Sequence, residues 1–508
     1  MAKRFIFFVV LVLAFAVNIA AAQDMEPQNG GTLRAAWQSE WESLDPHVAS
    51  SEATFQVLNN VLETLTFFDN DMNLIPWLAE SWERSDDGLT WTFYLREGVL
   101  FSNGREMTAD DVVWSLQRLI DPEVASGNAW RIGTDTIIEA VDTYTVAITT
   151  SAPSATLPAS IAANKSIAVM APESVNDEGF VDVPIGTGPF VIAEVEGTTR
   201  ILLERNENYW QEGLPYLDAV EITPITDDAA RELALEGGEV DWIFTISPQN
   251  LEALQADENV IVETSPRLSY DYMGLNLMRE PFNDVRVRQA IAYALDRNII
   301  CNFAFFGLCE PIQGPTASGT AWYFPYSPYD QNLDMARSLL EEAGYADGFE
   351  MTINPVIGFE ETIRGAQVIQ QQLAAIGITV NVEPEESTII IEKQGTGEFD
   401  ALMWSWLGLT DAEDYFYLQH RTGQGFNFTG YSNEEFDALV DEGRTLDSFE
   451  ERYAVYEQAN QILVDDAPYI YLYAKSEVKA WAPSVHGFAV RPDSAVNFWT
   501  VWLEGDME

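Results

Sequence analysis

The chain has 508 residues, and its 81 acidic residues outnumber its 26 lysines and arginines, which gives a formal net charge of −55 at pH 7. Such a charge repels nucleic acid and anionic lipid, so we expect binding to neither. The apolar content of 47% and the length predict a globular protein of two or more domains. Only three histidines are present, far apart, and no Cys/His spacing typical of zinc occurs, so neither a metal nor a cofactor is expected.

Residues 1–22 have the pattern of a secretory signal peptide. Lys3 and Arg4 precede an apolar stretch that ends at Val17, and the alanines at 20–22 supply a cleavage site. A membrane anchor is the alternative, but the apolar run is shorter than the ~20 residues that a membrane span needs. No cysteine lies near the cleavage site, so no lipid anchor is predicted. We therefore expect a freely soluble protein in a bacterial periplasm.

The first third of the chain is predicted to be rich in strands. Residues 89–104 alternate apolar and polar side chains and turn at Glu97-Gly98 and Asn103-Gly104, a pattern typical of hairpins. Residues 109–121 have helical periodicity, and Thr108 with Asp111 forms a T-x-x-D start signal ahead of them.

Later segments are predicted to be more helical, and the mixture of strands and helices indicates an α/β or α+β fold. A strand is expected at 398–407, and another follows the helix that ends at Gly377. S-x-x-E capping boxes at Ser432/Glu435 and Ser448/Glu451 predict where the last two helices begin. The expected helices are 285–300, 333–345, the first part of 365–382, 432–444 and 448–466.

Two compositional features carry further expectations. Cys301 and Cys309 are the only cysteines, and secretion permits a disulfide between them; two buried free thiols are the alternative. Only five lysines occur, and the acidic residues are spread along the chain. This spread favours a solvated surface over a cationic partner and predicts a protein adapted to high salt, where screening removes self-repulsion.

Several segments together resemble the large solute-binding proteins of the dipeptide/oligopeptide/nickel transporter class (family 5), which feed ABC importers. The resemblance runs from about Gly31 to the end of the chain, and the stretch 74–122 is its most specific part. The similar segments are GGTLRAAW (30–37), SLDPH (43–47), 74–122, GTGPFVIAEV (186–195), NENYW (206–210), PFNDVRVRQAIAYALDR (281–297) and ARSLLEEAGY (336–345).

The resemblance implies an α/β, two-lobed periplasmic binding protein fold, type II-like and of cluster C. Lobe one would span 31–268 plus 475–508, with an extra subdomain at about 50–180, and lobe two would span 269–474. Residues 269–276 and 470–478 would cross between the lobes, and ligand would lie between them. The resemblance also implies a turn and then a helix around PWLAESW (76–82), rather than the calcium loop that the acidic residues before it suggest.

The strand predicted at 398–407 is the main candidate for ligand contact. Its alternation places Trp404 and Trp406 on one face, near the carboxyl end, where ligands of open α/β sheets bind. The alternative is that both tryptophans pack under a helix.

Two anchors that the family uses for dipeptides are missing. Peptide-binding members hold the ligand α-amine with an Asp in a GW-x-x-D pattern, and Leu409 stands at that place. Asp411 is the nearest replacement, although it could instead be a first-turn acid of a helix capped by Thr410 and Glu413. Val356 stands where the family has a carboxylate-binding Arg, and Arg364 is the closest arginine. A free dipeptide is therefore disfavoured.

The remaining candidates are aromatic or amide residues expected near the cleft, with Trp130 and Arg131 as weaker ones. Aromatic rings supply a large contact area and can stack on sugars, guanidinium groups or peptide planes. The candidate ligand-binding residues are Trp37, Trp41, Tyr270, Tyr272, Trp404, Trp406, Asp411, Asn427 and Tyr431.

The resemblance implies a periplasmic substrate-binding protein, not an enzyme. It would be a monomer that captures a peptide or similar organic solute and delivers it to an inner-membrane ABC permease. Because the chain has 15 tryptophans, an oligosaccharide is the alternative ligand. A secreted hydrolase is poorly supported, since no G-x-S-x-G occurs.

Overall fold

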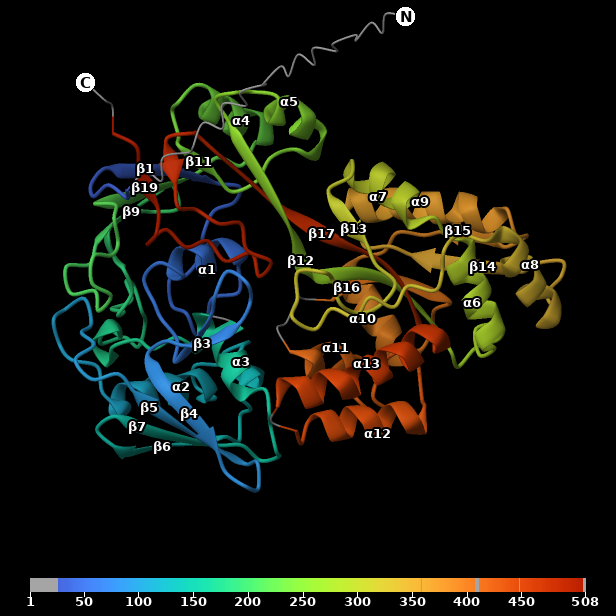
Figure 1. Ribbon diagram of the computed structural model, residues 1–508, viewed down its shortest axis with the longest axis horizontal. Helices are drawn as coiled ribbons and strands as arrows, with labels where there is room; N and C mark the ends of the chain where they lie inside the picture. The colour runs from blue at the N-terminus through green and yellow to red at the C-terminus, as the bar shows by residue number, and fades with distance from the viewer. Residues whose placement is uncertain (1–25, 164, 358, 407–410, 447, 506–508) are drawn as a thin grey trace, which may run out of the picture.

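The computed structural model describes residues 26–505 except 164, 358, 407–410 and 447. The predicted signal peptide lies outside the described residues. Figure 1 shows two bodies joined by two long strands, β12 (Ile261–Leu275) and β17 (Tyr469–Trp481). We call the left-hand body lobe one and the right-hand body lobe two. The lobe boundaries predicted at 268/269 and 474/475 fall inside these two strands.

One mixed sheet runs through both lobes. Its strand order is β15-β14-β16-β12-β17-β11-β1-β10-β9-β8, and β13 pairs with β17 outside this path. In lobe two, β14 is parallel to β15 and β16, whereas β12 is antiparallel to β16 and β17. The strands are β1 (Thr32–Trp37), β8 (Phe190–Glu196), β9 (Arg200–Arg205), β10 (Ala219–Pro224), β11 (Trp242–Ile243), β13 (Cys309–Pro311), β14 (Glu350–Asn354), β15 (Thr379–Val382) and β16 (Ala401–Trp406).

A second sheet, in the order β4-β5-β7-β6, forms the lower part of lobe one in Figure 1, within the region predicted for an extra subdomain. Trp91, Phe93 and Leu95 of β5 are buried, as the alternation predicted. The elements of this region are α1 (Glu52–Leu58), β2 (Thr66–Phe68), β3 (Leu74–Pro76), β4 (Ala79–Arg84), β5 (Thr90–Leu95), α2 (Ala109–Ile120), η1 (Ala129–Arg131), β6 (Ile137–Asp142), β7 (Thr145–Thr149), α3 (Leu157–Ala163), η2 (Lys165–Ile167) and η3 (Pro172–Ser174).

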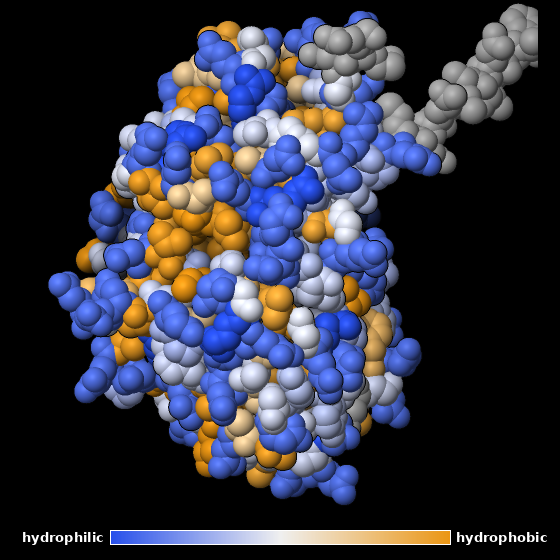
Figure 2. All heavy atoms as spheres, turned by 90° about the vertical axis from the view of Figure 1, so that its left-hand side faces the viewer, coloured by the Kyte–Doolittle hydropathy of each residue, from blue (hydrophilic) through white to orange (hydrophobic). Residues whose placement is uncertain are grey.

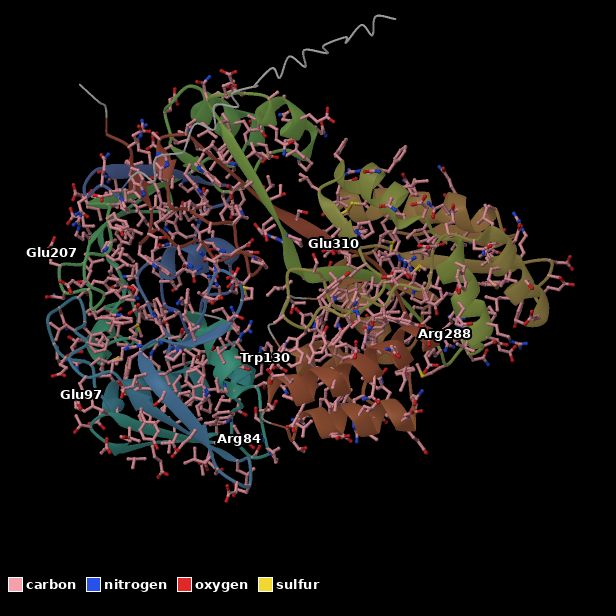
Figure 3. All side chains as sticks on the ribbon, in the orientation of Figure 1. Arg84, Glu97, Trp130, Glu207, Arg288 and Glu310 are labelled. Carbon is pink, nitrogen blue, oxygen red and sulfur yellow. A yellow bond between two sulfur atoms is a disulfide. The ribbon has the colours of Figure 1, made fainter. Side chains whose placement is uncertain are left out.

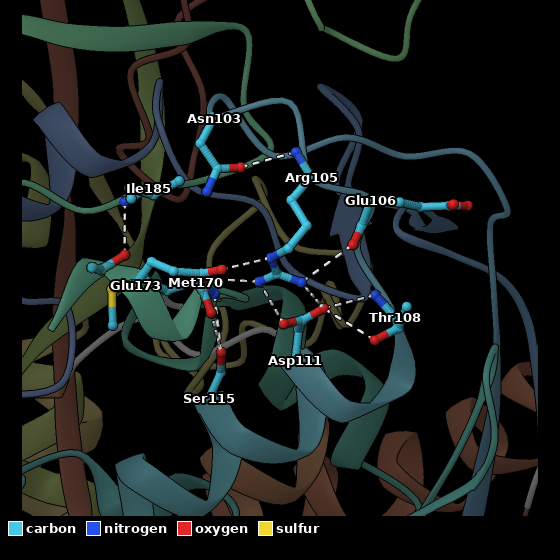
Figure 4. A network of polar contacts seen from close by, with 10 residues as sticks. Asn103, Arg105, Glu106, Thr108, Asp111, Ser115, Met170, Glu173 and Ile185 are labelled. Carbon is cyan, nitrogen blue, oxygen red and sulfur yellow. Dashed lines mark hydrogen bonds and ion pairs between the residues drawn. The ribbon is translucent and has the colours of Figure 1, made fainter.

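The start of α2 is held by the polar network in Figure 4. The predicted capping box is confirmed: the Thr108 backbone N–H donates to Asp111 Oδ2 at 2.9 Å. Arg105 donates two further hydrogen bonds to this carboxylate, at 2.8 and 3.0 Å, and its Nε donates to Glu173 Oε1 at 2.8 Å. Ser115 Oγ donates to the Met170 carbonyl at 2.9 Å, which fastens α2 to the segment beside it.

Helices cover both faces of the lobe-two sheet. In Figure 1, α7 and α9 lie above β14–β16, and α11, α12 and α13 lie below them, so the two apolar faces of the sheet are both buried. The helices are α6 (Val285–Ala294), α7 (Arg297–Phe305), α8 (Leu333–Glu342), α9 (Glu360–Ala374), α10 (Ser387–Thr396), α11 (Ala412–His420), α12 (Glu434–Gly443) and α13 (Phe449–Asp466). Lobe one adds α4 (Asp228–Glu236), η4 (Pro248–Asn250) and α5 (Leu251–Gln255), and a short pair of strands, β18 (Val485–His486) and β19 (Trp502–Leu503).

Three predicted elements are wrong in detail. The PWLAESW segment (76–82) leads into strand β4 rather than into a helix, because residues 79–84 pair with β5 in the second sheet. The helix predicted at 285–300 is two helices, since Asp296 accepts hydrogen bonds from the Asn298 and Ile299 N–H groups and starts α7. The N-cap of α12 is Asn433, whose side chain accepts from the first-turn N–H groups, and not Ser432.

Cys301 and Cys309 form a disulfide, which joins α7 to β13. Within the described ranges, no helix combines the length and apolar character needed to cross a membrane. Figure 2 shows that hydrophilic residues cover most of the lobe-one face turned away from lobe two, while hydrophobic residues gather in a patch in its upper half.

Candidate functional site

The candidate site is built on the middle of the lobe-two sheet, where β16 lies between β14 and the crossing strand β12. Tyr270 is opposite Trp406 in the β12–β16 ladder, and Tyr272 is opposite Trp404. Side chains directly opposite each other share a face, so the fold brings these four predicted residues together. The carboxyl end of β16 leads into residues 407–410, outside the described residues, and then into α11.

The two tyrosines are the buried members of this group of four residues. Tyr270 and Tyr272 are fully buried, and the ring of Tyr272 stacks on Tyr469 with centroids 4.1 Å apart. The Tyr270 hydroxyl donates to Gln419 Oε1, and burial raises the pKa of Tyr270 well above its usual value. Both rings belong to the buried cluster against which Trp404 and Trp406 pack, and their contact with a ligand stays a prediction.

The two tryptophans are the partly exposed members of the group. Both are half-buried, and Trp406 makes an edge contact with Phe426 at 5.2 Å between centroids. Phe426 is 53% exposed, and sequence reasoning missed it, although its place between glycine-containing turns in GQGFNF signalled a presented aromatic ring. The Trp406 indole N–H is buried without a hydrogen-bond partner among the described residues.

Asp411 is engaged inside the protein. It is the N-cap of α11, with Oδ1 accepting from the Glu413 N–H at 2.9 Å, and it is 5% exposed. Arg452 donates two hydrogen bonds to its carboxylate, at 2.8 and 2.6 Å. The helix-start role weighed for Asp411 is therefore the one seen, although the capping residue is Asp411 itself, whereas the predicted cap Thr410 lies outside the described residues. No free carboxylate oxygen of Asp411 faces a ligand amine here.

Asn427 and Tyr431 organise the loop that carries Phe426. Asn427 Nδ2 donates to the carbonyls of Tyr431 at 2.8 Å and His420 at 3.1 Å. Tyr431 is buried, and its hydroxyl donates to Asp466 Oδ2 at 2.7 Å. Their side chains are thus used in holding the loop in place, and direct ligand contact by either residue stays a prediction.

Trp37 and Trp41 lie in lobe one, apart from the four residues on the β12–β16 ladder. Trp37 is fully buried in an aromatic core against Trp242, at 5.3 Å between centroids. Trp41 donates from Nε1 to the Gly197 carbonyl at 3.0 Å and lines a cavity of about 900 Å³ together with Phe180 and Arg118. The described contacts do not bring these tryptophans to Trp404 and Trp406.

The arginine considered for a ligand carboxylate is also engaged elsewhere. Arg364 Nη2 donates to the Ala304 carbonyl at 2.8 Å, and the guanidinium lies over the Phe306 ring. Val356 is buried and bridges to Glu385. Val356 therefore supplies no charge at the place of the carboxylate anchor, and Leu409, at the place of the amine anchor, lies outside the described residues.

A charged group that sequence reasoning missed lies on the opposite face of the same ladder. Ser405 Oγ donates to Asp271 Oδ1 at 2.5 Å, and Lys475 Nζ lies 3.9 Å from the same carboxylate oxygen and 3.3 Å from Glu361 Oε1. Burial raises the pKa of Asp271, while Lys475 and Ser405 lower it. Lys475 is one of only five lysines in the chain, and this scarcity was the one feature of the sequence that pointed to it as a candidate.

On the lobe-one side, Trp130 is 53% exposed and lies at the border next to α11 in Figure 3. Burial lowers the pKa of its neighbour Arg131, and the charge of Asp414 on α11 opposes that shift. The weaker pair of predicted residues therefore faces lobe two. Among the described residues, no three His, Cys, Asp or Glu side chains are grouped so that they could hold a metal ion.

A mixed sheet shared by two lobes, with two strands crossing between them, defines the class of two-lobed periplasmic binding proteins, and the predicted fold class is confirmed. The family described as Bacterial extracellular solute-binding proteins, family 5 Middle, matches residues 73–428. The chain belongs to this family, and it is a solute-binding protein rather than an enzyme.

Three known proteins show how far the similarity extends. The glutathione-binding protein GsiB of Salmonella typhimurium is 30% identical over 476 residues, which cover 91% of this chain and 92% of GsiB. The structure of Helicobacter pylori DppA in complex with the peptide STSA is 27% identical, with a TM-score of 0.75 over 94% of this chain and 99% of DppA. The unliganded open form of MppA, a periplasmic murein tripeptide binding protein, is 24% identical, with a TM-score of 0.85 over 95% and 99% of the two chains.

Proposed function

We propose that this chain is the periplasmic binding component of an ABC importer and that it captures a short peptide or similar organic solute between its lobes. The working form would be a monomer, released after cleavage of residues 1–22. The observation that carries the proposal is the partly open Trp404–Trp406–Phe426 group at the end of β16, in a chain 30% identical to a glutathione-binding protein.

The relatives favour a peptide over the alternative oligosaccharide. GsiB is named for glutathione, and DppA was solved with a tetrapeptide. Indole and phenyl rings can stack on peptide planes as well as on sugar rings, so the aromatic group at the end of β16 is compatible with a peptide. Because Asp411 is paired with Arg452, the ligand amine would be held by a group other than Asp411, the replacement nearest to Leu409 in the sequence.

A thermal-shift screen of the purified chain tests the proposal. Glutathione, the peptide Ser-Thr-Ser-Ala, maltotetraose and a nickel chelate would each be added in excess. A ligand at about 100 times its Kd should add about 2.7 kcal/mol to the free energy of unfolding. Stabilisation by a peptide supports the proposal, and stabilisation by maltotetraose alone would replace it with the oligosaccharide reading.

Trp406→Ala provides the mutational test at the site. It should weaken peptide binding while leaving the melting temperature in the absence of ligand nearly unchanged, because Trp406 is half-buried at the end of a strand. Trp37→Ala is the matched comparison: this tryptophan is fully buried, and its loss should cost about 3–5 kcal/mol of stability. If Trp406→Ala unfolds the chain to the same extent, Trp406 is a core residue and not a contact.

A further inference from the structure

The five buried arginines in the described part of the chain differ in what balances their charge. Four of them have an acidic residue beside the guanidinium. These are Arg231 with Asp228, Arg452 with Asp411 and Arg491 with Asp493 as ion pairs, and Arg288, labelled in Figure 3, which has the charge of Asp466 near it. Arg297, at the start of α7, is the exception: no described carboxylate forms an ion pair with it, in a chain of 81 acidic residues.

Arg297 is held by backbone carbonyls alone. It is 5% exposed, and its Nε donates to the Tyr471 carbonyl of β17 at 2.7 Å. Nη1 donates to the carbonyls of Ala292 and Tyr329, both at 3.4 Å, and no acceptor among the described residues is bonded to Nη2. Burial lowers the pKa of Arg297 to about 10, so the guanidinium stays charged at neutral pH. A buried charge without a counterion is costly.

The guanidinium lines a cavity of about 170 Å³ in lobe two, between α7, the end of β13 and the loop that carries Tyr329. Gln313 Oε1 accepts from the Tyr329 N–H at 2.6 Å, so the NH₂ group of Gln313 is the part that this side chain can offer to the cavity. Asn298, Ser327 and Gln331 add further neutral polar side chains to the wall. The space is sufficient for a small ion and several water molecules.

Two acidic residues also line the cavity, and neither balances Arg297. Asp296 is the N-cap of α7, and its Oδ1 accepts from the N–H groups of Asn298 at 3.0 Å and Ile299 at 3.2 Å. The positive end of the helix therefore stabilises this carboxylate. Asp330 is exposed to solvent, and it forms no ion pair with Arg297. These two acids would repel a multiply charged anion, which leaves room for a single negative charge next to Arg297.

We propose that this cavity binds a small monovalent anion, chloride or one of similar size, beside Nη2 of Arg297 and the side-chain amide of Gln313. The anion would supply the negative charge that acidic residues supply to the other four buried arginines. It would also fasten α7 and the loop that carries Tyr329 to β17, because the same guanidinium holds the Tyr471 carbonyl. The inference makes no use of the solute-binding function and concerns a site apart from the β12–β16 ladder.

Gln313→Glu tests the proposal, because it places a carboxylate in the cavity. A glutamate can still accept from the Tyr329 N–H, and its charge would balance Arg297 without a bound anion. Chlorine nuclear magnetic resonance of the full chain in NaCl measures bound chloride through the broadening of the chloride signal. Wild type should broaden this signal, and Gln313→Glu should lose most of the broadening. In chloride-free buffer the variant should also melt at a higher temperature than wild type, and added NaCl should reduce that advantage, because chloride stabilises the folded wild type.

Gln367→Glu is the matched control, since it adds the same charge on the exposed face of α9, outside the cavity. It should broaden the chloride signal as wild type does and should melt no higher than wild type. The inference is overturned if Gln313→Glu broadens the signal as much as wild type, or if Gln367→Glu loses the broadening equally.

Diffraction from wild-type crystals grown in NaBr gives a second measurement that needs no variant. An anomalous bromine peak beside Arg297 Nη2 supports the proposal, and a cavity that holds only water overturns it. Neither result bears on the thermal-shift screen with peptides, so this inference and the proposed function fail separately.

Discussion

At the scale of single residues, the most consequential contact is the one between Asp411 and Arg452. Both side chains are less than a tenth exposed, and two hydrogen bonds join them. Breaking a buried pair by removing one partner leaves an uncompensated charge inside the protein. The same acidic side chain that looked available for a ligand amine is therefore needed for the stability of α11 and α13.

Asp411→Ala should lower the free energy of unfolding by about 3–5 kcal/mol, as measured by urea titration. Asp441→Ala removes the partner of Arg421 in a more exposed pair and serves as the control. That control should cost less than about 1 kcal/mol. Equal, small losses in the two variants would show that the Asp411–Arg452 pair is not needed for stability.

A second prediction at this scale concerns pH. Burial lowers the pKa of His420 to about 3, from an ordinary value near 6.5. Between these values the unfolded chain binds a proton that the folded chain does not, so the stability from neutral His420 is complete above pH 6.5 and is lost as the pH falls toward 3. The slope from this residue is about 1.4 kcal/mol per pH unit.

His420→Gln should therefore flatten the dependence of stability on pH between 6.5 and 4, relative to wild type. The comparison with wild type matters because burial raises the pKa of Glu63, Asp271 and Asp414, whose titration acts in the opposite direction. Urea titrations at pH 7, 6, 5 and 4 provide the slopes. Parallel curves for the two proteins would contradict the prediction.

At the scale of elements, the disulfide joins α7 to the short strand β13, which pairs with β17. Cys309 is opposite Lys475 in that ladder, so the crosslink lies beside the register shift between Pro266 and Tyr270 in the β12–β17 ladder. In the chain-entropy description, closing a loop this short stabilises the fold by about 2–3 kcal/mol.

The double variant Cys301→Ser, Cys309→Ser should consequently melt at a lower temperature, with a loss of about 2–3 kcal/mol. Wild type treated with dithiothreitol should melt at the temperature of the variant, and the reductant should leave the variant unchanged. A variant as stable as the oxidised wild type would show that the crosslink adds nothing to stability.

At the scale of the whole molecule, charge is the dominant feature. A net charge of −55 produces self-repulsion that destabilises the compact state, and salt screens it. Figure 2 shows the hydrophilic surface over which this charge is spread.

We expect the free energy of unfolding to rise between about 10 mM and 1 M NaCl, where the Debye length falls from 30 Å to about 3 Å. Urea titrations at both salt concentrations measure it. Sucrose, which is uncharged, serves as a control for general solute exclusion. Stability that is unchanged across this range would remove the prediction of adaptation to high salt.

The sequence by itself determined the family and the two-lobed fold class, through segments that resemble family 5. It also determined most local structure, because helices and strands depend on periodicity and on short-range capping. Thr108 with Asp111 and Ser448 with Glu451 start their helices as predicted, since the partners are three residues apart. Alternation also predicted that Trp404 and Trp406 share one face of their strand and that Tyr270 and Tyr272 share one face of theirs. The pairing of β12 with β16 in the structure brought the two faces together.

Only the tertiary structure decided which of these side chains are open to a ligand. Arg452 is 41 residues from Asp411, and no local pattern shows that it takes that carboxylate. Likewise, Tyr272 is buried because it stacks on Tyr469, from the second crossing strand, and Arg267 meets Glu52 from a distant helix. Long-range pairing selects among residues that are chemically alike, so the sequence defined a set of aromatic and acidic candidates and the folded arrangement decided which ones remain free.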